Sequence, residues 1–328
     1  MTGPCSTPVS CSGKSCRCPD GIQLSDISVQ IGPVRFKNPV FIASGICGYA
    51  EEYSPLVNLS RLGGVVTKTI TMLPRPGNLP PRIHELPHGM LNSIGLENVG
   101  LDRYVKEKLP QLNQRPDVGV MVSVAAETEE EFIQLAEAFA PMDGYAGLEL
   151  NLSCPNVKGE ALDQGRNPTL VERITRIVKE RIPKKSLWIK VTPNITDVGV
   201  VARAAEQGGA DAIAAINTLV GIDFDLETGK PVFARGSAGY SGPAILPIAL
   251  QKVWECSRAV TIPIVGIGGI THIDDARKFF LAGATAIQVG TTLYNDPALP
   301  ERIVDALAEN PEWIHARANP AHAATRKS

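Results

Sequence analysis

Polar side chains follow an apolar, strand-like run near the middle of the sequence. The segment Glu-Leu-Asn-Leu-Ser-Cys-Pro-Asn carries Asn151, Cys154 and Asn156. A free cysteine is most often a small buried residue. Here it stands among polar groups, where a thiol could act as a general base, because an ordinary cysteine pKa of about 8.5 needs only a modest shift at neutral pH. We therefore expect Cys154 to be catalytic.

Two lysines occur at the ends of other apolar runs. Lys68 closes Val-Val-Thr-Lys, and Lys190 lies in Trp-Ile-Lys-Val. Such a lysine can extend to solvent or join a buried ion pair, but its desolvation needs compensation. Two of them at one end of a sheet favour a bound anion or an electron-rich ring. A reduced flavin fits, since a cation stabilises the negative charge at its N1–C2=O edge.

Glycines follow two late strand-like runs, as Gly-Ile-Gly-Gly-Ile at 266–270 and Gly-Thr at 290–291. In β/α barrels the loops after strands seven and eight bind phosphate through backbone N–H groups, and glycine permits close approach. A tight turn would also use glycine, so either run alone is weak evidence. The two together predict a phosphate site.

Side-chain amides recur near these groups. Asn92 ends a proline-rich stretch, residues 73–93, that is too long for an ordinary loop and is expected to be a lid or substrate loop. Asn217 and Thr218 close a further strand-like run. Amides can match both the carbonyl and the N–H groups of a planar ligand such as a pyrimidine-dione. No metal site is expected, because prolines surround the histidines at 84 and 88.

The elements that must position these groups alternate between strand and helix. The strand-like runs are almost continuously apolar, which is typical of parallel strands buried on both faces. Eight strand–helix units favour a single (β/α)8 TIM barrel of the α/β class, with its active site at the C-terminal ends of the strands. The eight runs span 39–45, 64–70, 118–126, 147–153, 187–193, 212–218, 262–270 and 286–293.

Three intervening segments have helix-start and helix-stop patterns. Residues 128–140 open with Thr128 and Glu131, a capping-box pair. Residues 167–182 carry a proline near their start. Residues 197–209 end in two glycines.

The flanking segments extend the barrel. Residues 27–40 alternate and turn at Gly32–Pro33, which predicts an N-terminal β-hairpin at the bottom of the barrel, and Val220 to Ser241 forms a second long excursion. We expect a flexible Cys-rich N-terminal extension over 1–24 and a catalytic barrel over 25–328. The extension is rich in Ser, Thr, Pro and Gly, and its cysteine spacing matches no usual zinc or iron–sulfur run. These cysteines are Cys5, Cys11, Cys16 and Cys18.

Bulk properties exclude several classes. The chain has 328 residues and a net charge of -2, so it presents no overall basic field for nucleic acid. No apolar run approaches the roughly 18 residues that span a bilayer, and the first residues lack the apolar core of a secretory signal. We expect a cytoplasmic protein that binds neither nucleic acid nor membrane.

The sequence resembles class 1 dihydroorotate dehydrogenases from about residue 25 to 310. The loop MLNSIGLEN and the strand INTLVG are most similar to the class 1B catalytic subunit. The matching runs, in the same order, are GVVTKTITMLPRPGN, PHGMLNSIGLENVG, ELNLSCPNVKG, IKVTPN, INTLVG, YSGPAILPIAL, IVGIGGI and IQVGTTL.

The resemblance implies an FMN enzyme that oxidises (S)-dihydroorotate to orotate in pyrimidine (UMP) biosynthesis. Cys154 would remove the C5 proton while a hydride passes from C6 to flavin N5. Substrate would be bound by Lys68, Asn92, Ser93, Ile94, Gly95, Leu96, Asn151, Asn156, Asn217 and Thr218. FMN would be held by Ala43, Ser44, Gly45, Lys68, Thr69, Ser123, Asn151, Lys190, Ile216, Gly242, Gly268, Gly269, Gly290 and Thr291.

The same resemblance implies a homodimer of barrels and a partner subunit that carries FAD and a 2Fe–2S cluster and passes electrons to NAD+. Ser123 departs from the pattern, because many relatives carry asparagine there. Three alternatives stay open: a dihydropyrimidine dehydrogenase-type barrel that reduces uracil or thymine, a flavin-free phosphosugar isomerase, and a non-catalytic binding or electron-transfer barrel.

Overall fold

The computed structural model describes most of the chain between residues 16 and 315. Cys154 and Asn156 lie outside the described residues, as do Cys5, Cys11 and Cys18. The described residues are 16–17, 23–24, 26–51, 53, 55–115, 117–152 and 165–315.

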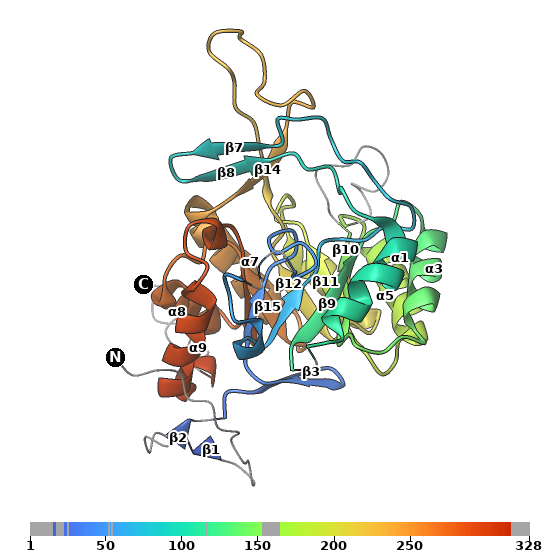
Figure 1. The fold of residues 1–328 in the computed structure, drawn as a ribbon, viewed down its shortest axis with the longest axis vertical. Helices are drawn as coiled ribbons and strands as arrows, with labels where there is room; N and C mark the ends of the chain where they lie inside the picture. The colour runs from blue at the N-terminus through green and yellow to red at the C-terminus, as the bar shows by residue number, and fades with distance from the viewer. Residues whose placement is uncertain are drawn as a thin grey trace, which may run out of the picture.

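Eight parallel strands close into a barrel (Figure 1), which confirms the predicted architecture. Around the barrel the order is β5, β6, β9, β10, β11, β12, β15 and β16, with β16 paired to β5. Each strand is shorter than its predicted run, because the polar residues at the C-terminal end belong to the loops. The strands are β5 (Val40–Ile42), β6 (Gly64–Val66), β9 (Gly119–Val124), β10 (Gly147–Asn151), β11 (Ser186–Val191), β12 (Ala212–Ala215), β15 (Ile264–Ile267) and β16 (Ala286–Val289).

A hairpin closes the bottom of the barrel, as predicted. Strands β3 (Val29–Ile31) and β4 (Val34–Phe36) pair antiparallel around Gly32, whose positive φ of 58° suits glycine. Phe36 packs against Phe41 and Trp188, with ring centroids 5.0 and 5.8 Å away. These buried rings fill the lower interior of the barrel, at the end opposite the C-terminal ends of the strands.

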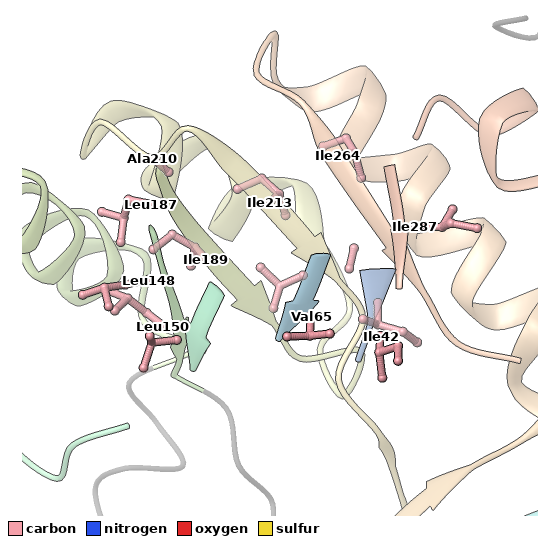
Figure 2. Close-up of a cluster of buried hydrophobic side chains, with 14 of the residues drawn as sticks. Ile42, Val65, Leu148, Leu150, Leu187, Ile189, Ala210, Ile213, Ile264 and Ile287 are labelled. Atoms are coloured by element: carbon pink, nitrogen blue, oxygen red, sulfur yellow. The ribbon is translucent and has the colours of Figure 1, made fainter. Parts of the chain in front are cut away.

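The outward strand residues form the main core with the helices. Figure 2 shows side chains of this layer, among them Leu148, Leu187 and Ile213, all fully buried. Each such side chain contributes about 1.5–3 kcal/mol relative to an exposed one. The covering helices are α3 (Glu129–Phe139), α5 (Pro168–Arg181), α6 (Val198–Gln207), α7 (Leu246–Ala259), α8 (Ile273–Leu281) and α9 (Leu299–Glu309).

The three predicted helices are confirmed, with one difference at a cap. The Thr128 side chain accepts from the Glu131 N–H at 3.2 Å, as a capping box requires. Glu131 in turn accepts from the N–H of Glu127 at 2.8 Å, one residue earlier than the box predicts. Asn167 and Asp197 cap α5 and α6 through their side chains.

A four-stranded antiparallel sheet lies over the mouth, at the opposite end from β3 (Figure 1). It consists of β7 (Ile83–Leu86) and β8 (Gly89–Asn92) from the proline-rich stretch, with β13 (Leu219–Gly221) and β14 (Ala238–Ser241) from the second excursion. The central β14–β8 pair joins the two segments. The sequence predicted both excursions but not their pairing.

Shorter elements complete the described chain. They are β1 (Cys16–Arg17) paired with β2 (Gln23–Leu24), the helices α1 (Gly100–Arg103) and α2 (Leu109–Leu112), the π-helical turn η2 (Tyr104–Lys108), and the 3-10 turns η1 (Leu59–Arg61), η3 (Pro243–Ile245), η4 (Thr291–Tyr294) and η5 (Pro311–His315).

Candidate active site

A cavity that opens to solvent lies at the C-terminal ends of the strands. This is the face where barrels of this type place their active sites. The predicted site residues that line it are Ala43, Ser44, Gly45, Lys68, Thr69, Asn92, Ile94, Leu96, Asn151, Lys190, Ile216, Asn217, Thr218, Gly242, Gly268, Gly269, Gly290 and Thr291.

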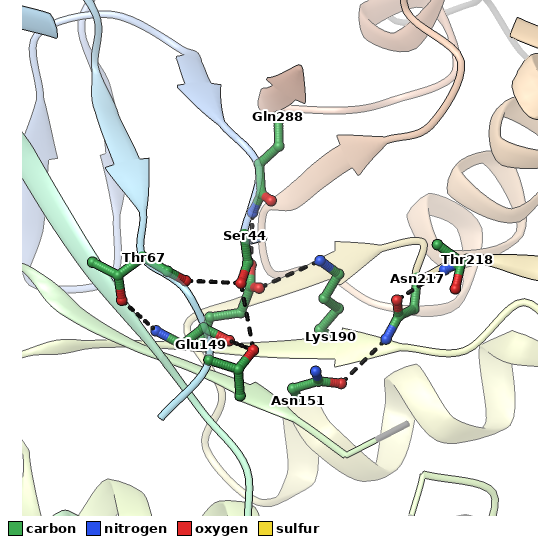
Figure 3. A network of polar contacts seen from close by, with 10 residues as sticks. Ser44, Thr67, Glu149, Asn151, Lys190, Asn217, Thr218 and Gln288 are labelled. Atoms are coloured by element: carbon green, nitrogen blue, oxygen red, sulfur yellow. Dashed lines mark hydrogen bonds and ion pairs between the residues drawn. The ribbon is translucent and has the colours of Figure 1, made fainter. Parts of the chain in front are cut away.

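The floor of the cavity carries a buried polar cluster (Figure 3). Lys190 lines the cavity and is only 7% exposed, and its Nζ lies 3.6 Å from Oε1 of Glu149, which is fully buried. Gln288 donates from Nε2 to the other carboxylate oxygen of Glu149 at 2.6 Å. Lys190 was predicted, but Glu149 and Gln288 were not.

A hydroxyl network supports one wall. Ser44 donates from Oγ to the Thr67 carbonyl at 2.8 Å, and its Oγ lies 3.4 Å from the Thr69 hydroxyl (Figure 3). Thr69 also shares a 2.9 Å hydrogen bond with Ser123. Ser123 is fully buried and does not line the cavity. The structure thus gives it a supporting contact to a cavity residue, and its predicted contact with FMN stays a prediction.

Two amides at the ends of β10 and β12, which flank β11 in the barrel, are hydrogen-bonded to each other. Asn217 donates from Nδ2 to Oδ1 of Asn151 at 3.1 Å, and its own Oδ1 accepts from the Thr218 N–H at 2.8 Å (Figure 3). Asn92 arrives from β8 and donates to the Gly239 carbonyl at 3.2 Å. Three of the four predicted amides therefore meet at the cavity, and the fourth, Asn156, lies outside the described residues.

The loop after Asn92 lines the cavity with alternate residues. Ile94 and Leu96 face it, whereas Ser93 is buried and accepts from Asn78 at 2.9 Å through its hydroxyl. Gly95, with a φ of 75°, faces Asn78 on the far side of the loop. Leu96 also has a positive φ of 56°, and such a conformation is uncommon for a side chain of this size. Ser93 and Gly95 would act on a ligand only through backbone groups or loop shape.

The glycine-rich end of the cavity combines two loops and the end of β14. Gly268 and Gly269 have positive φ values of 125° and 75°, and a Cβ on Gly269 would lie 2.6 Å from the Leu246 nitrogen. Thr291 donates to the Ser241 hydroxyl at 2.9 Å and so ties the loop after β16 to the end of β14. Gly266, like Gly268 and Gly269, also makes room for neighbouring protein atoms, in its case the Phe279 ring of α8.

Several cavity residues escaped the sequence analysis. Tyr294 follows the Gly-Thr run and lines the mouth, and burial raises the pKa of its phenol above the ordinary value, so it stays neutral at physiological pH. Most of the rest are apolar, and only the closed fold brings them together. The additional lining residues are Ile46, Ile83, Met90, Glu97, Ser241, Ile245, Ile267, Ile270, Thr292 and Tyr294.

The described residues contain neither a metal-ligand cluster nor a membrane-spanning helix. No group of three or more His, Cys, Asp or Glu side chains there could hold a metal ion. His84, in the proline-rich stretch, places its Nε2 2.8 Å from an Asp223 carboxylate oxygen. None of the described helices combines the length and apolarity that a membrane crossing requires.

Comparison with known proteins identifies the family. The sequence profile described as dihydroorotate dehydrogenase matches residues 26–310. The chain belongs to the dihydroorotate dehydrogenase family. It is 44% identical to a Thermoanaerobacter protein, over 87% of this chain and 93% of that one, and 45% identical to a Geotalea daltonii protein, over 87% and 94%. Both are named dihydroorotate dehydrogenase B (NAD+), catalytic subunit.

A solved structure supports the fold. The dihydroorotate dehydrogenase of Eimeria tenella, crystallised with ferulenol, superposes with a TM-score of 0.75 at 22% identity, covering 90% of this chain and 89% of that one. The profile match and the identities to the curated relatives confirm the dihydroorotate dehydrogenase family expected from the sequence.

Proposed function

We propose that this protein is the catalytic subunit of an NAD+-linked dihydroorotate dehydrogenase, which binds FMN and dihydroorotate together in the cavity at the barrel mouth. The observation that carries the proposal is the composition of that cavity. One end is walled by glycines, the floor holds the buried Lys190, and the opposite side presents the Asn151–Asn217 amide pair.

The residues present fit FMN. Gly268, Gly269 and Gly290 leave backbone exposed where a phosphate could approach. The Lys190 ammonium at the floor suits the ring edge on which negative charge develops. When bound, FMN would supply hydride acceptance from the substrate.

The remaining polar groups fit the substrate. Lys68 offers a cation for the dihydroorotate carboxylate, and Asn92, Asn151 and Asn217 offer donors and acceptors for the ring carbonyl and N–H groups. Cys154 follows the last residue of β10 by three positions and, by family resemblance, takes the C5 proton. The amides would hold the ring in a fixed orientation for this proton transfer.

A partner subunit completes the electron path in this proposal. Two relatives are named catalytic subunits of an NAD+-linked enzyme, which supports a second subunit. By the family resemblance, that subunit carries FAD and a 2Fe–2S cluster and delivers electrons to NAD+. We further infer a homodimer of barrels acting in the cytoplasm. The arm between β13 and β14 exposes Ile222, Phe224 and Leu226, and such apolar groups are suited to contact with another chain.

Turnover of a cysteine variant tests the base. Cys154→Ser should lower kcat for dihydroorotate by about 100-fold or more, the usual contribution of a general base, while FMN stays bound. Cys256→Ala is the matched control, because Cys256 is a buried cysteine of α7 that does not line the cavity, and its turnover should be unchanged. Wild-type turnover in Cys154→Ser would remove Cys154 from the mechanism.

A substrate assay and the colour of the purified protein distinguish the proposed function from the alternative barrels. The wild-type protein, supplied with FMN, should be yellow and should oxidise dihydroorotate without reducing uracil or thymine. Uracil reduction in place of dihydroorotate oxidation would favour the dihydropyrimidine dehydrogenase alternative. A protein that binds no flavin would favour the isomerase alternative.

A further inference from the structure

We propose that Glu149, held by Gln288, is a positioning residue that fixes the Lys190 ammonium at the floor of the cavity and thereby sets the reduction potential of the bound flavin. The inference rests on the proposed function, because it requires FMN in the cavity.

Glu149 occupies a place where a carboxylate is unexpected. It is fully buried inside the barrel, whose interior cluster of apolar side chains includes Ala43, Ala214 and Ile267. Burial of a carboxylate in such surroundings costs several kcal/mol unless a cation and hydrogen bonds offset it. A pair of apolar residues of similar size would be as stable or more so, which indicates that stability alone does not explain this carboxylate.

The strand register directs Glu149 at Lys190. Asn151 pairs with Lys190, and Glu149 pairs with Trp188, so the carboxylate lies one inward-facing position below the lysine. The pair distance is 3.6 Å, and the lysine side chain also lines the cavity. The ammonium therefore lies between a fixed anion below and the ligand space above.

Gln288 in turn fixes Glu149 from across the barrel. Strand β16 stands four places from β10 in the closed order of eight, so the 2.6 Å hydrogen bond spans the interior (Figure 3). It occupies Oε2 of Glu149 and leaves Oε1 facing Lys190. Among the described residues, Oε1 of Glu149 and Oε1 of Gln288 accept no hydrogen bond. The contact that the structure describes at Oε1 of Glu149 is the one with the Lys190 ammonium.

The direction in which the flavin potential shifts when Glu149 is lost distinguishes a positioning role from a direct effect of its charge. Loss of a negative charge that acted only through space would make flavin reduction easier. If Glu149 instead holds the lysine in place, its loss lets the flexible four-carbon stem of Lys190 carry the ammonium away from the ring. The cation then stabilises the reduced ring less well, so reduction becomes harder.

The test uses the FMN-loaded protein and two readouts other than turnover. The first is the two-electron midpoint potential of the flavin. The second is the dissociation constant of sulfite, whose sulfur lone pair forms a bond to N5 of oxidised flavin and leaves negative charge on the N1–C2=O edge. Glu149→Gln, which keeps the shape but removes the charge, should weaken sulfite binding at least tenfold and lower the potential by about 30 mV.

A double variant shows whether the effect acts through the lysine. Glu149→Gln combined with Lys190→Met leaves no buried charge in the pair, so the double variant should fold. Its sulfite dissociation constant should lie within twofold of the value for Glu149→Gln alone, and its midpoint potential should differ from that variant's by no more than the corresponding amount. Glu97→Gln is the control for through-space charge, since Glu97 lines the rim of the same cavity and pairs with Arg82 at 2.7 Å. It should leave potential and sulfite binding nearly unchanged.

Several results would overturn the inference while leaving the proposed function intact. One is unchanged or tighter sulfite binding in Glu149→Gln. Another is a double variant whose sulfite affinity and flavin potential are well below those of Glu149→Gln. If Glu149→Gln does not retain FMN, Gln288→Met replaces it, because that change removes only the hydrogen bond to Glu149. Gln288→Met should shift both readouts in the same direction by a smaller amount, and no shift would refute the proposal. A wild-type protein that binds no FMN would overturn the proposed function and this inference with it.

Discussion

Asp275 stabilises the glycine-rich loop of the cavity, and its replacement by asparagine tests that role. The loop residues Gly268, Gly269 and Ile270 line the cavity, and Thr271 follows them. Oδ2 of Asp275 accepts from the N–H and hydroxyl of Thr271 at 3.1 and 3.0 Å and from the His272 N–H at 3.1 Å. This buried carboxylate therefore ties the loop to the first turn of α8.

The expected cost follows from these contacts. Asparagine keeps one carbonyl oxygen for the three donors, but that acceptor is neutral. A hydrogen bond to a charged group contributes about 1.5–3 kcal/mol and a neutral one about 0.5–1.5 kcal/mol. Because one oxygen shared by three donors does not give additive terms, we expect Asp275→Asn to lower the free energy of unfolding by about 1–2 kcal/mol. Lys278, which donates to Oδ1 at 3.0 Å, is half exposed and adds little.

The loss in free energy of unfolding caused by Asp275→Asn should decrease at low pH. Burial alone would raise the pKa of Asp275, but the hydrogen bonds from Lys278 and Thr271 outweigh it and hold the pKa below its ordinary 3.8. A carboxyl with a depressed folded-state pKa stabilises the protein above the unfolded value and loses this contribution as pH falls through the folded value. The gap between wild type and Asp275→Asn should be full near pH 7 and should shrink below about pH 3.8.

Urea unfolding of wild type and Asp275→Asn near pH 7 and near pH 3 measures the loss in free energy of unfolding and its dependence on pH. Asp102→Asn provides the control, because Asp102 is an exposed aspartate paired with Lys106, and its loss should cost at most about 0.5 kcal/mol. A variant as stable as wild type near pH 7, or a gap that persists undiminished near pH 3, would refute this account of the loop.

Three further experiments test the packing of the barrel and the Cys-rich N-terminal extension. Trp188→Ala should lower the free energy of unfolding by about 3–5 kcal/mol in urea titration, since the fully buried indole fills the lower barrel. Gly266→Ala should cost about 1–3 kcal/mol, because its Cβ would lie 2.3 Å from the Phe279 ring, and a second change, Phe279→Leu, should recover part of that loss. Iron analysis of the purified chain should find less than one iron per chain if residues 1–24 hold no cluster.

The barrel was predictable from sequence because its strands carry a strong local pattern. Each strand is a short apolar run with a polar or glycine residue at its C-terminal end, and one rule about barrels collects those ends at a single mouth. That rule correctly brought Lys68, Lys190, Asn151 and Asn217 to one cavity. The base, Cys154, was assigned by the same rule and by resemblance, and its role stays a prediction.

The sheet over the mouth was not predictable in the same way. Its strands are three or four residues long, and half of it lies in a proline-rich stretch that lacks a clear alternation. The β14–β8 pairing joins residues about 150 positions apart, and nothing local specifies such a contact. Ser241 and Met90 reach the cavity only because this pairing exists.

The polar cluster at the floor is a different case, because the sequence contained the information. In a strand, residues two apart face the same side. Once Asn151 is predicted to face the barrel mouth, Glu149 must face the interior as well, while Leu148 and Leu150 face the helices. A carboxylate inside a barrel requires a cation, and a lysine predicted at the end of the adjacent strand meets that requirement. The alternation within β10, read together with Lys190, thus predicts the pair that we propose sets the potential of the flavin.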